Sequence, residues 1–191
     1  MEKKFLKDDD SKMLKITKNL YLKEILKSDS TLLYNLMKEI YPPAYTSFWE
    51  DNGDWYIETQ YSKSNIEKEL AEKRAPYYFI IYNDEIVGNF RILWNECLNG
   101  LSTEKTVKLH RVYLHQKVHG KGIGKDLISW LEKEARKNKY KIVWLDAMNK
   151  QEQAFQFYKK IGFKYHSHTF LDFEKMHDSY RKMSQVYKRL D

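Results

Sequence analysis

The sequence predicts a single α/β domain over residues 13 to 191, with a mixed central sheet flanked by helices. Several short segments alternate apolar and polar residues, as half-buried strands do. Two later segments carry apolar residues at helical spacing, and glycines or turn residues separate the two kinds of segment. The chain has 191 residues, of which 42% are hydrophobic, and this is enough for one domain with a core. Residues 1 to 12 are highly charged and are expected to form a flexible lead-in.

The N-terminal third predicts one strand and two helices around an aromatic segment. The expected elements are a strand at residues 13–18, a helix at 21–40, an irregular aromatic segment at 41–62 and a helix at 64–73. The first helix should end before Pro42, because proline does not continue a helix. The second begins with the capping residue Ser64 and continues with good helix formers.

The rest of the chain contains further segments with the two-residue period of strands and the 3.6-residue period of helices. They are strands at residues 77–82, 85–94 and 107–115, a helix from 122, a strand at 141–148, a helix at 151–161, and segments at 164–173 and 182–189. Asn83 and Asp84 form the turn of a hairpin between the first two of these strands. Gly162 stands where a left-handed helix C-cap is expected. Residues 164–173 read as a strand, whereas 182–189 fit either a strand or a helix.

Composition excludes several classes of protein. No stretch approaches the roughly 20 apolar residues that span a bilayer, and the charged N-terminus has no apolar signal region. Cys97 is the only cysteine, which excludes an internal disulfide and fits a cytoplasmic protein. The net charge of +7 comes from lysines spread along the chain, so a solvated surface is expected rather than a partner that is a nucleic acid or a membrane.

A glycine loop lies between the strand at 107–115 and the following helix. Gly120, Gly122 and Gly124 are three of the seven glycines in the chain. Glycine lets backbone N–H groups approach a ligand closely, and a helix N-terminus adds free donors and partial positive charge. The loop therefore predicts a phosphate site. It matches neither the P-loop pattern nor the dinucleotide fingerprint.

The segment VYLHQKVHGKGIGKDLI resembles the pyrophosphate loop of the GNAT superfamily of acetyl-CoA-dependent N-acetyltransferases, Gln/Arg-x-x-Gly-x-Gly/Ala. His119 stands at the Gln/Arg position, and Gly122 and Gly124 stand at the small positions. The resemblance implies that acetyl-CoA is the cosubstrate and that backbone groups of this loop hold its diphosphate. The implied contacts are Val112, Tyr113 and Leu114 along the pantetheine arm and His119, Gly120, Lys121, Gly122, Ile123, Gly124 and Lys125 around the diphosphate.

A second motif, NKQEQAFQFYKKIGF at residues 149–163, resembles the pattern Asn-x-x-Ala-x-x-Phe-Tyr-x-x-x-Gly-Phe of the same superfamily. Gln151 occupies the usual Asn place and Asn149 lies two residues earlier, so either amide is expected to contact CoA. Phe157 is either a cofactor contact or helix core. Tyr158 is implied to be the general acid that protonates the departing thiolate. The resemblance covers residues 77 to 163 well, including a hairpin with Gly88 in the usual place.

The predicted reaction moves an acetyl group from a thioester to a primary amine. A free alkylamine has a pKa of about 10.4, so it must lose a proton before it attacks. Many GNAT relatives carry a glutamate three residues before the position of Tyr113, and His110 stands there in this chain. His110 is a candidate base, and a structural histidine is an equal alternative. The spacing of the histidines matches no metal motif, so no metal is expected.

An acidic aromatic segment suggests the acceptor. Residues 39 to 62 contain five carboxylates and no Lys or Arg, and tyrosines and tryptophans are interleaved with the carboxylates. Carboxylates beside aromatic ring faces are the groups that bind an alkylammonium ion. The candidate substrate-binding residues are Trp49, Glu50, Asp51, Asp54 and Trp55. Together with a loose likeness to bacterial spermidine/spermine acetyltransferases, the segment favours a polyamine or another cationic amine. A protein N-terminus or lysine, or a catalytically silent CoA-binding module, is the alternative. The oligomeric state is expected to be monomer or homodimer.

Overall fold

The computed structural model describes residues 12 to 101 and 103 to 191. The expected lead-in over residues 1 to 12 lies outside them, apart from Lys12. The strands of the described chain are β1 (Met13–Lys15), β2 (Leu20–Glu24), β3 (Tyr77–Tyr82), β4 (Glu85–Trp94), β5 (Thr106–Leu114), β6 (Ile142–Met148), β7 (Lys164–Phe170) and β8 (Lys182–Arg189).

The helices of the described chain lie in two groups along the sequence. The α-helices are α1 (Ser30–Ile40), α2 (Pro42–Tyr45), α3 (Asp54–Gln60), α4 (Lys63–Ala71), α5 (Ile123–Lys137) and α6 (Glu152–Lys160). Short 3₁₀ helices are η1 (Lys27–Asp29), η2 (Thr46–Phe48), η3 (Gln116–Val118) and η4 (Asp178–Tyr180). No helix in the described ranges is long and apolar enough to cross a membrane.

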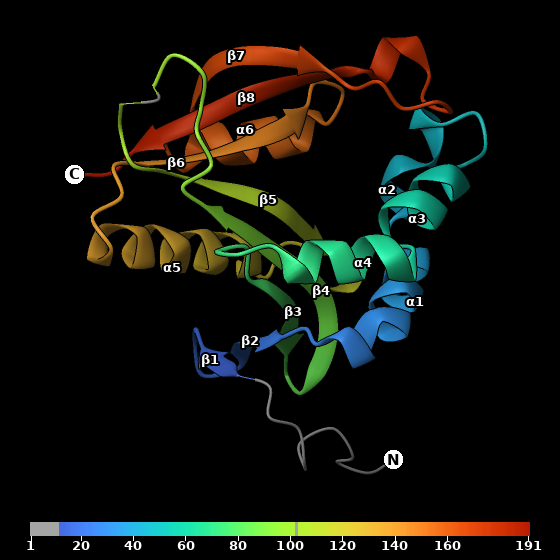
Figure 1. Ribbon diagram of the computed structural model, residues 1–191, viewed down its shortest axis with the longest axis horizontal. Helices are drawn as coiled ribbons and strands as arrows, with labels where there is room; N and C mark the ends of the chain where they lie inside the picture. Colours follow the sequence, from blue (N-terminus) through green and yellow to red (C-terminus); the bar gives the residue numbers. More distant parts are fainter. Residues whose placement is uncertain (1–11, 102) are drawn as a thin grey trace.

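The strands form one mixed sheet in the order β1-β2-β3-β4-β5-β6-β8-β7. All neighbours are antiparallel except β5 and β6, which run parallel. Helices α1 to α4 cover one face, and α5 and α6 cover the other (Figure 1). Two large apolar clusters fill the two layers, and the one beneath α1 to α4 is rich in aromatic rings. A small third cluster contains Leu98, Ile142 and Trp144. The predicted α/β class with a mixed, helix-flanked sheet is therefore confirmed.

The predicted helix over residues 21 to 40 is wrong in its first part. Residues 20–24 form strand β2, and the helix α1 starts only at Ser30. Leu20 and Leu22 are buried while Tyr21 between them is partly exposed, so this stretch has the two-residue period of a strand. Pairing with β3 satisfies its backbone groups, and this long-range partner outweighs the local helical preference.

Smaller differences concern the segment that was expected to be irregular. It contains α2 and all of α3, with a left-handed Gly53 before α3. The cap of α4 is Ser62 and not Ser64, because the Ser62 hydroxyl accepts a hydrogen bond from the Asn65 N–H at 3.2 Å. The predicted hairpin turn is confirmed, with positive φ at both Asn83 and Asp84. Residues 182–189 are a strand.

Candidate active site

Helix α5 begins at the glycine loop with an open, donor-rich N-terminus. Gly120 and Gly122 have φ values of 75° and 81°, and a Cβ built on either would meet nothing within 4 Å. The first bond into the helix is from the Asp126 N–H to the Gly122 carbonyl, at 3.0 Å. The N–H groups of residues 123 to 125 have no backbone acceptor within the described ranges. Free donors beside open space fit a diphosphate, as the loop predicted.

The side chains around this loop are tied to the protein rather than free. His119 Nε2–H donates to the carbonyl of Leu114 at 3.0 Å, which anchors the loop to the end of β5. Lys117 forms an ion pair of 2.8 Å with Glu85, and the Lys121 ammonium lies 5.8 Å from the centroid of the Tyr82 ring. Each of these side chains thus has a contact within the protein, whereas the N–H groups of residues 123 to 125 have no backbone acceptor within the described ranges.

Strands β5 and β6 separate beyond the middle of the sheet. Their ladder runs only from the Thr106–Ile142 pair to the Leu109–Leu145 pair, although both strands continue. Their outer partners stay paired, β5 with β4 as far as Leu114 and β6 with β8 as far as Met148. A cavity of about 310 Å³ occupies this region and is lined by residues from both strands.

A β-bulge at His110 turns the outer part of β5. Arg91 of β4 pairs with Arg111, whereas the next residue, Ile92, pairs with Leu109, so His110 has no partner across the ladder. Leu109 therefore packs in the cluster beneath α5 and α6, while Tyr113 packs in the aromatic cluster on the other face. The bulge gives the cavity an aromatic wall on the side of α1 to α4.

The environment of His110 does not support the expected role as base. Its Nδ1 accepts a hydrogen bond from Arg91 Nη1 at 2.7 Å, because a guanidinium only donates. Burial, with the charges of Arg111, Arg91 and Lys108, lowers the pKa of His110 to about 2. The imidazole is neutral at neutral pH and its accepting nitrogen is occupied, so the structural alternative describes it better.

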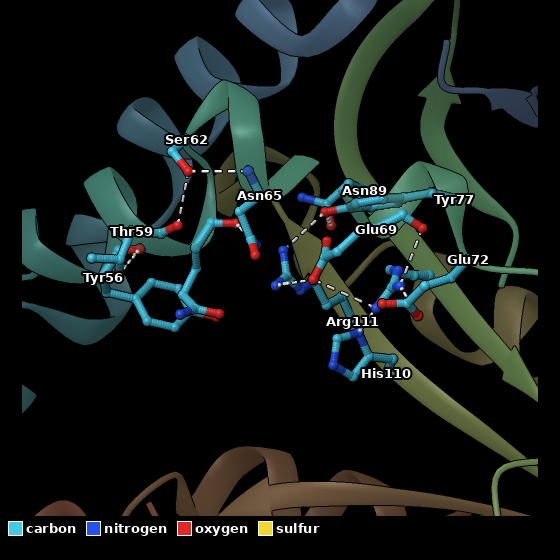
Figure 2. Close-up of polar contacts among 12 residues, drawn as sticks. Tyr56, Thr59, Ser62, Asn65, Glu69, Glu72, Tyr77, Asn89, His110 and Arg111 are labelled. Carbon is cyan, nitrogen blue, oxygen red and sulfur yellow. Dashed lines mark hydrogen bonds and ion pairs between the residues drawn. The ribbon is translucent and has the colours of Figure 1, made fainter. Parts of the chain in front are cut away.

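A buried ionic network holds the bulge against α4. Glu69 Oε1 accepts a hydrogen bond from Arg111 Nη2 at 2.7 Å and lies 3.5 Å from Arg91 Nη1, while Glu72 pairs with Arg91 at 2.7 Å (Figure 2). Burial raises the pKa of Glu69, and the two arginines oppose this shift. The guanidinium groups near the cavity are thus already paired with carboxylates.

The pKa of His110 leads to a prediction about stability. An unfolded histidine has a pKa of about 6.5, so below that pH His110 is protonated in the unfolded chain but stays neutral in the folded chain. This group alone should lower the free energy of unfolding by about 2 kcal/mol between pH 7 and pH 5. Urea unfolding at the two pH values should show that loss in the wild type and not in His110→Gln. The exposed His168→Gln is the control, and an equal pH dependence in all three proteins would contradict the assignment.

Tyr158 of α6 lines the cavity. Burial raises the pKa of Tyr158 to about 12, so its hydroxyl is protonated at neutral pH and can donate a proton. Its ring packs against Phe157 and Phe163 at centroid distances of 5.2 and 5.7 Å. A Cβ on Gly124 would lie 3.4 Å from Phe157 Cζ, so the first turn of α5 abuts α6. The glycine loop and the Tyr158 helix are therefore neighbours.

Both candidate amides of the second motif bond within the protein. Asn149 Oδ1 accepts a hydrogen bond from Ser184 Oγ at 2.7 Å, which ties it to β8. Gln151 Nε2 donates to the carbonyl of Ala44 in α2 at 2.9 Å, and Gln151 also lines the cavity. Of the two, Gln151 is the one placed at the cavity.

The acidic segment contributes aromatic rings to the cavity, and its carboxylates lie elsewhere. Of the five candidate substrate-binding residues only Trp49 lines the cavity. Asp51 accepts hydrogen bonds from the N–H groups of Gly53 at 3.1 Å and Trp55 at 2.7 Å, so it caps the start of α3. Glu50 and Asp54 are exposed. The sequence showed that the segment is acidic, but it did not show that the Asp51 carboxylate would accept hydrogen bonds at the start of α3.

The cavity also contains a charged pair that the motifs did not reveal. Lys108 of β5 and Asp146 of β6 form an ion pair of 2.6 Å, and both line the cavity. The one signal in the sequence was a lone aspartate within the apolar run KIVWLDAM. Within the described ranges, no three His, Cys, Asp or Glu side chains gather as a metal site.

Comparisons with known proteins agree with this architecture. A profile of the acetyltransferase (GNAT) family matches residues 34 to 163. An uncharacterized N-acetyltransferase in the pepI 3′ region of Lactobacillus delbrueckii subsp. lactis is 22% identical over 117 residues, which are 61% of this chain and 68% of that protein.

Two solved structures share the fold. The PaiA N-acetyltransferase of Thermoplasma acidophilum in complex with coenzyme A has a TM-score of 0.67 and 19% identity, over 89% of this chain and 98% of that one. RimL, a ribosomal L7/L12 alpha-N-protein acetyltransferase in complex with coenzyme A, has a TM-score of 0.69 and 12% identity, over 94% and 99%. The profile covers more than half of the chain, and its family is the one whose motifs the glycine loop and residues 149–163 resemble. The chain belongs to the GNAT family of acetyl-CoA-dependent N-acetyltransferases.

Proposed function

We propose that this enzyme acetylates a small cationic primary amine by direct attack within the cavity between β5 and β6. The observation that carries the proposal is the position of Tyr158, which lines the same cavity as the separated strands and whose hydroxyl is protonated at neutral pH. Its ring packs on the α5 and α6 side, together with the glycine loop, whereas the aromatic wall is on the other side. The two substrates would thus meet from opposite faces of the sheet.

The cosubstrate supplies an activated acetyl thioester, and the separated strand supplies donors for its oxygen. The His115 N–H bonds to Val87 on β4 at 2.8 Å, whereas the Leu114 carbonyl accepts from His119. Successive residues of a strand direct their backbone groups to alternate edges, so the N–H groups of Val112 and Leu114 point away from β4. That edge borders the gap, where such donors stabilise developing negative charge on the thioester oxygen.

The walls of the cavity favour a compact amine. Five aromatic residues of the segment that was expected to bind the acceptor line the cavity: Tyr41, Tyr45, Phe48, Trp49 and Tyr56. Ring faces attract an ammonium group and pack against an apolar body. A polyamine carries several ammonium groups, whereas Asp146 is the one carboxylate among the residues of the described chain that line the cavity. An amine with a single charge and an aromatic or alkyl body therefore fits better than a polyamine.

A thiol-release assay with acetyl-CoA and a panel of amines tests the proposal. The panel contains arylalkylamines and alkylamines, spermidine, and a peptide with a free N-terminus, and the N-acetylated form of each compound is its control. We expect small monoamines to be turned over on the order of once per second or faster, with lower kcat/KM for spermidine and for the peptide. A preference for the peptide would favour a protein acceptor. No thiol release with any amine would leave a silent CoA-binding module.

A further inference from the structure

Asp146 occupies the point at which β5 and β6 separate. The ladder between these strands ends at the Leu109–Leu145 pair, so Asp146 is the first residue of β6 beyond it. Leu145 and Ala147 pack in the cluster beneath α5 and α6, and strand alternation therefore directs Asp146 to the face covered by α1 to α4. This is the face of the aromatic wall.

The Asp146 carboxylate is held in place but is not saturated. Lys108 Nζ lies 2.6 Å from Oδ2, and Gln185 Nε2 donates to Oδ1 at 3.2 Å. Gln185 is itself oriented, because its Oε1 accepts a hydrogen bond from Ser167 Oγ at 2.7 Å. A carboxylate has about four acceptor positions, so these two contacts leave capacity for an incoming N–H group. The side chain is 17% exposed, which keeps it accessible from the cavity.

The other ionisable groups that line the cavity are unsuited to an ammonium ion. Lys108 and Arg111 are cations, and Arg111 is already paired with Glu69. His110 is neutral and its Nδ1 is engaged by a guanidinium. Burial raises the pKa values of four tyrosines that line the cavity, Tyr41, Tyr45, Tyr113 and Tyr158, the last to about 12. Their hydroxyl groups therefore stay protonated and do not accept a proton near neutral pH. Among these groups, Asp146 is the one that is both negative and able to accept.

We propose that Asp146 is a catalytic residue that binds the ammonium group of the acceptor and takes one of its protons, a role that rests on the proposed function. An N–H bond of the ammonium group breaks and the proton moves to a carboxylate oxygen of Asp146, which releases it to solvent. The nitrogen lone pair then forms the bond to the acetyl carbon, and the C–S bond breaks. Tyr158 protonates the thiolate and regains a proton from the same nitrogen, so the acceptor loses two protons in all.

Asp146→Asn tests this role through its pH dependence. At pH 7 we expect kcat/KM for a monoamine to fall about 100-fold, at the low end for a general base. As the pH rises toward the amine pKa of about 10.4, free amine becomes abundant and no base is needed, so the deficit should shrink to within about threefold of wild type near pH 10. A merely structural role would leave a deficit that is constant with pH. Asp84→Asn, in an exposed turn where both residues tolerate positive φ, is the matched control.

A second variant separates the loss of the base from the loss of the ion pair. Asp146→Asn leaves Lys108 without its partner in a partly buried place, whereas Lys108→Gln with Asp146→Asn removes both charges. We expect the same pH-dependent deficit in both variants, with CoA binding by calorimetry as the measure of an intact fold. Wild-type kcat/KM in Asp146→Asn at pH 7, or a deficit that does not change with pH, would overturn the inference alone. No turnover of any amine by the wild type would overturn the proposed function and the inference together.

Discussion

Replacement of Gly122 by glutamate is expected to abolish binding of coenzyme A. Gly122 has a φ of 81° and immediately precedes α5, beside the N–H groups that have no backbone acceptor within the described ranges. A Cβ there enters open space, so the new side chain would occupy the volume that a diphosphate needs and would add like charge. We expect binding to weaken by more than about 100-fold, or about 2.7 kcal/mol, by isothermal calorimetry.

Gly100→Glu is the control for the strain of the substitution. Gly100 has a φ of 80°, close to that of Gly122, and it is exposed in a turn outside the glycine loop. A side chain at positive φ costs about 1–3 kcal/mol of stability at either position. Only the Gly122 variant should lose binding. A folded Gly122→Glu protein that binds coenzyme A like the wild type would show that the diphosphate lies elsewhere.

Tyr158→Phe should lower kcat strongly while leaving the affinity for CoA nearly unchanged. The substitution removes one hydroxyl, and the packing of the ring against Phe157 and Phe163 remains. General acids contribute about 10² to 10⁴ in rate, and we expect a loss of kcat in that range. Steady-state kinetics with saturating amine, together with calorimetry of CoA binding, measure the two effects separately.

The control for Tyr158→Phe is the same substitution at an exposed position. Tyr165 on β7 is 57% exposed, and Tyr165→Phe should leave kcat unchanged. Burial raises the pKa of Tyr158 to about 12, so this acid should stay protonated on the alkaline side until the pH approaches that value. Unchanged kcat in Tyr158→Phe would mean that another group protonates the thiolate and that Tyr158 only packs.

The parts of the fold that the sequence predicted correctly depend on neighbours in the chain. The Asn83–Asp84 turn and the amphipathic face of α5 follow from residues a few positions apart, and local backbone preferences decide both. Gly162 has a φ of 96° at the end of α6, as its predicted C-cap requires. The positive φ values of Gly120 and Gly122 and the N–H groups of residues 123 to 125 without a backbone acceptor in the described ranges are likewise properties of the loop itself, and the phosphate site stays a prediction that rests on them.

Tertiary structure decided which side chains reach the cavity, because their partners come from distant segments. Residues 20–24 became a strand through pairing with β3, which outweighed the local helical preference. The neutral state of His110 depends on burial and on Arg91 of β4 as well as on the adjacent Arg111, and the first two are not visible from its own neighbours in the chain. Asp51 caps the start of α3 and does not line the cavity. Asp146, the lone aspartate of an apolar strand, lines the cavity because β5 and β6 separate at this position. The sequence by itself determined the family, the cosubstrate and the order of most elements, since these depend on local motifs. The residues that line the cavity for the amine acceptor depend on burial and long-range pairing, which only the folded chain creates.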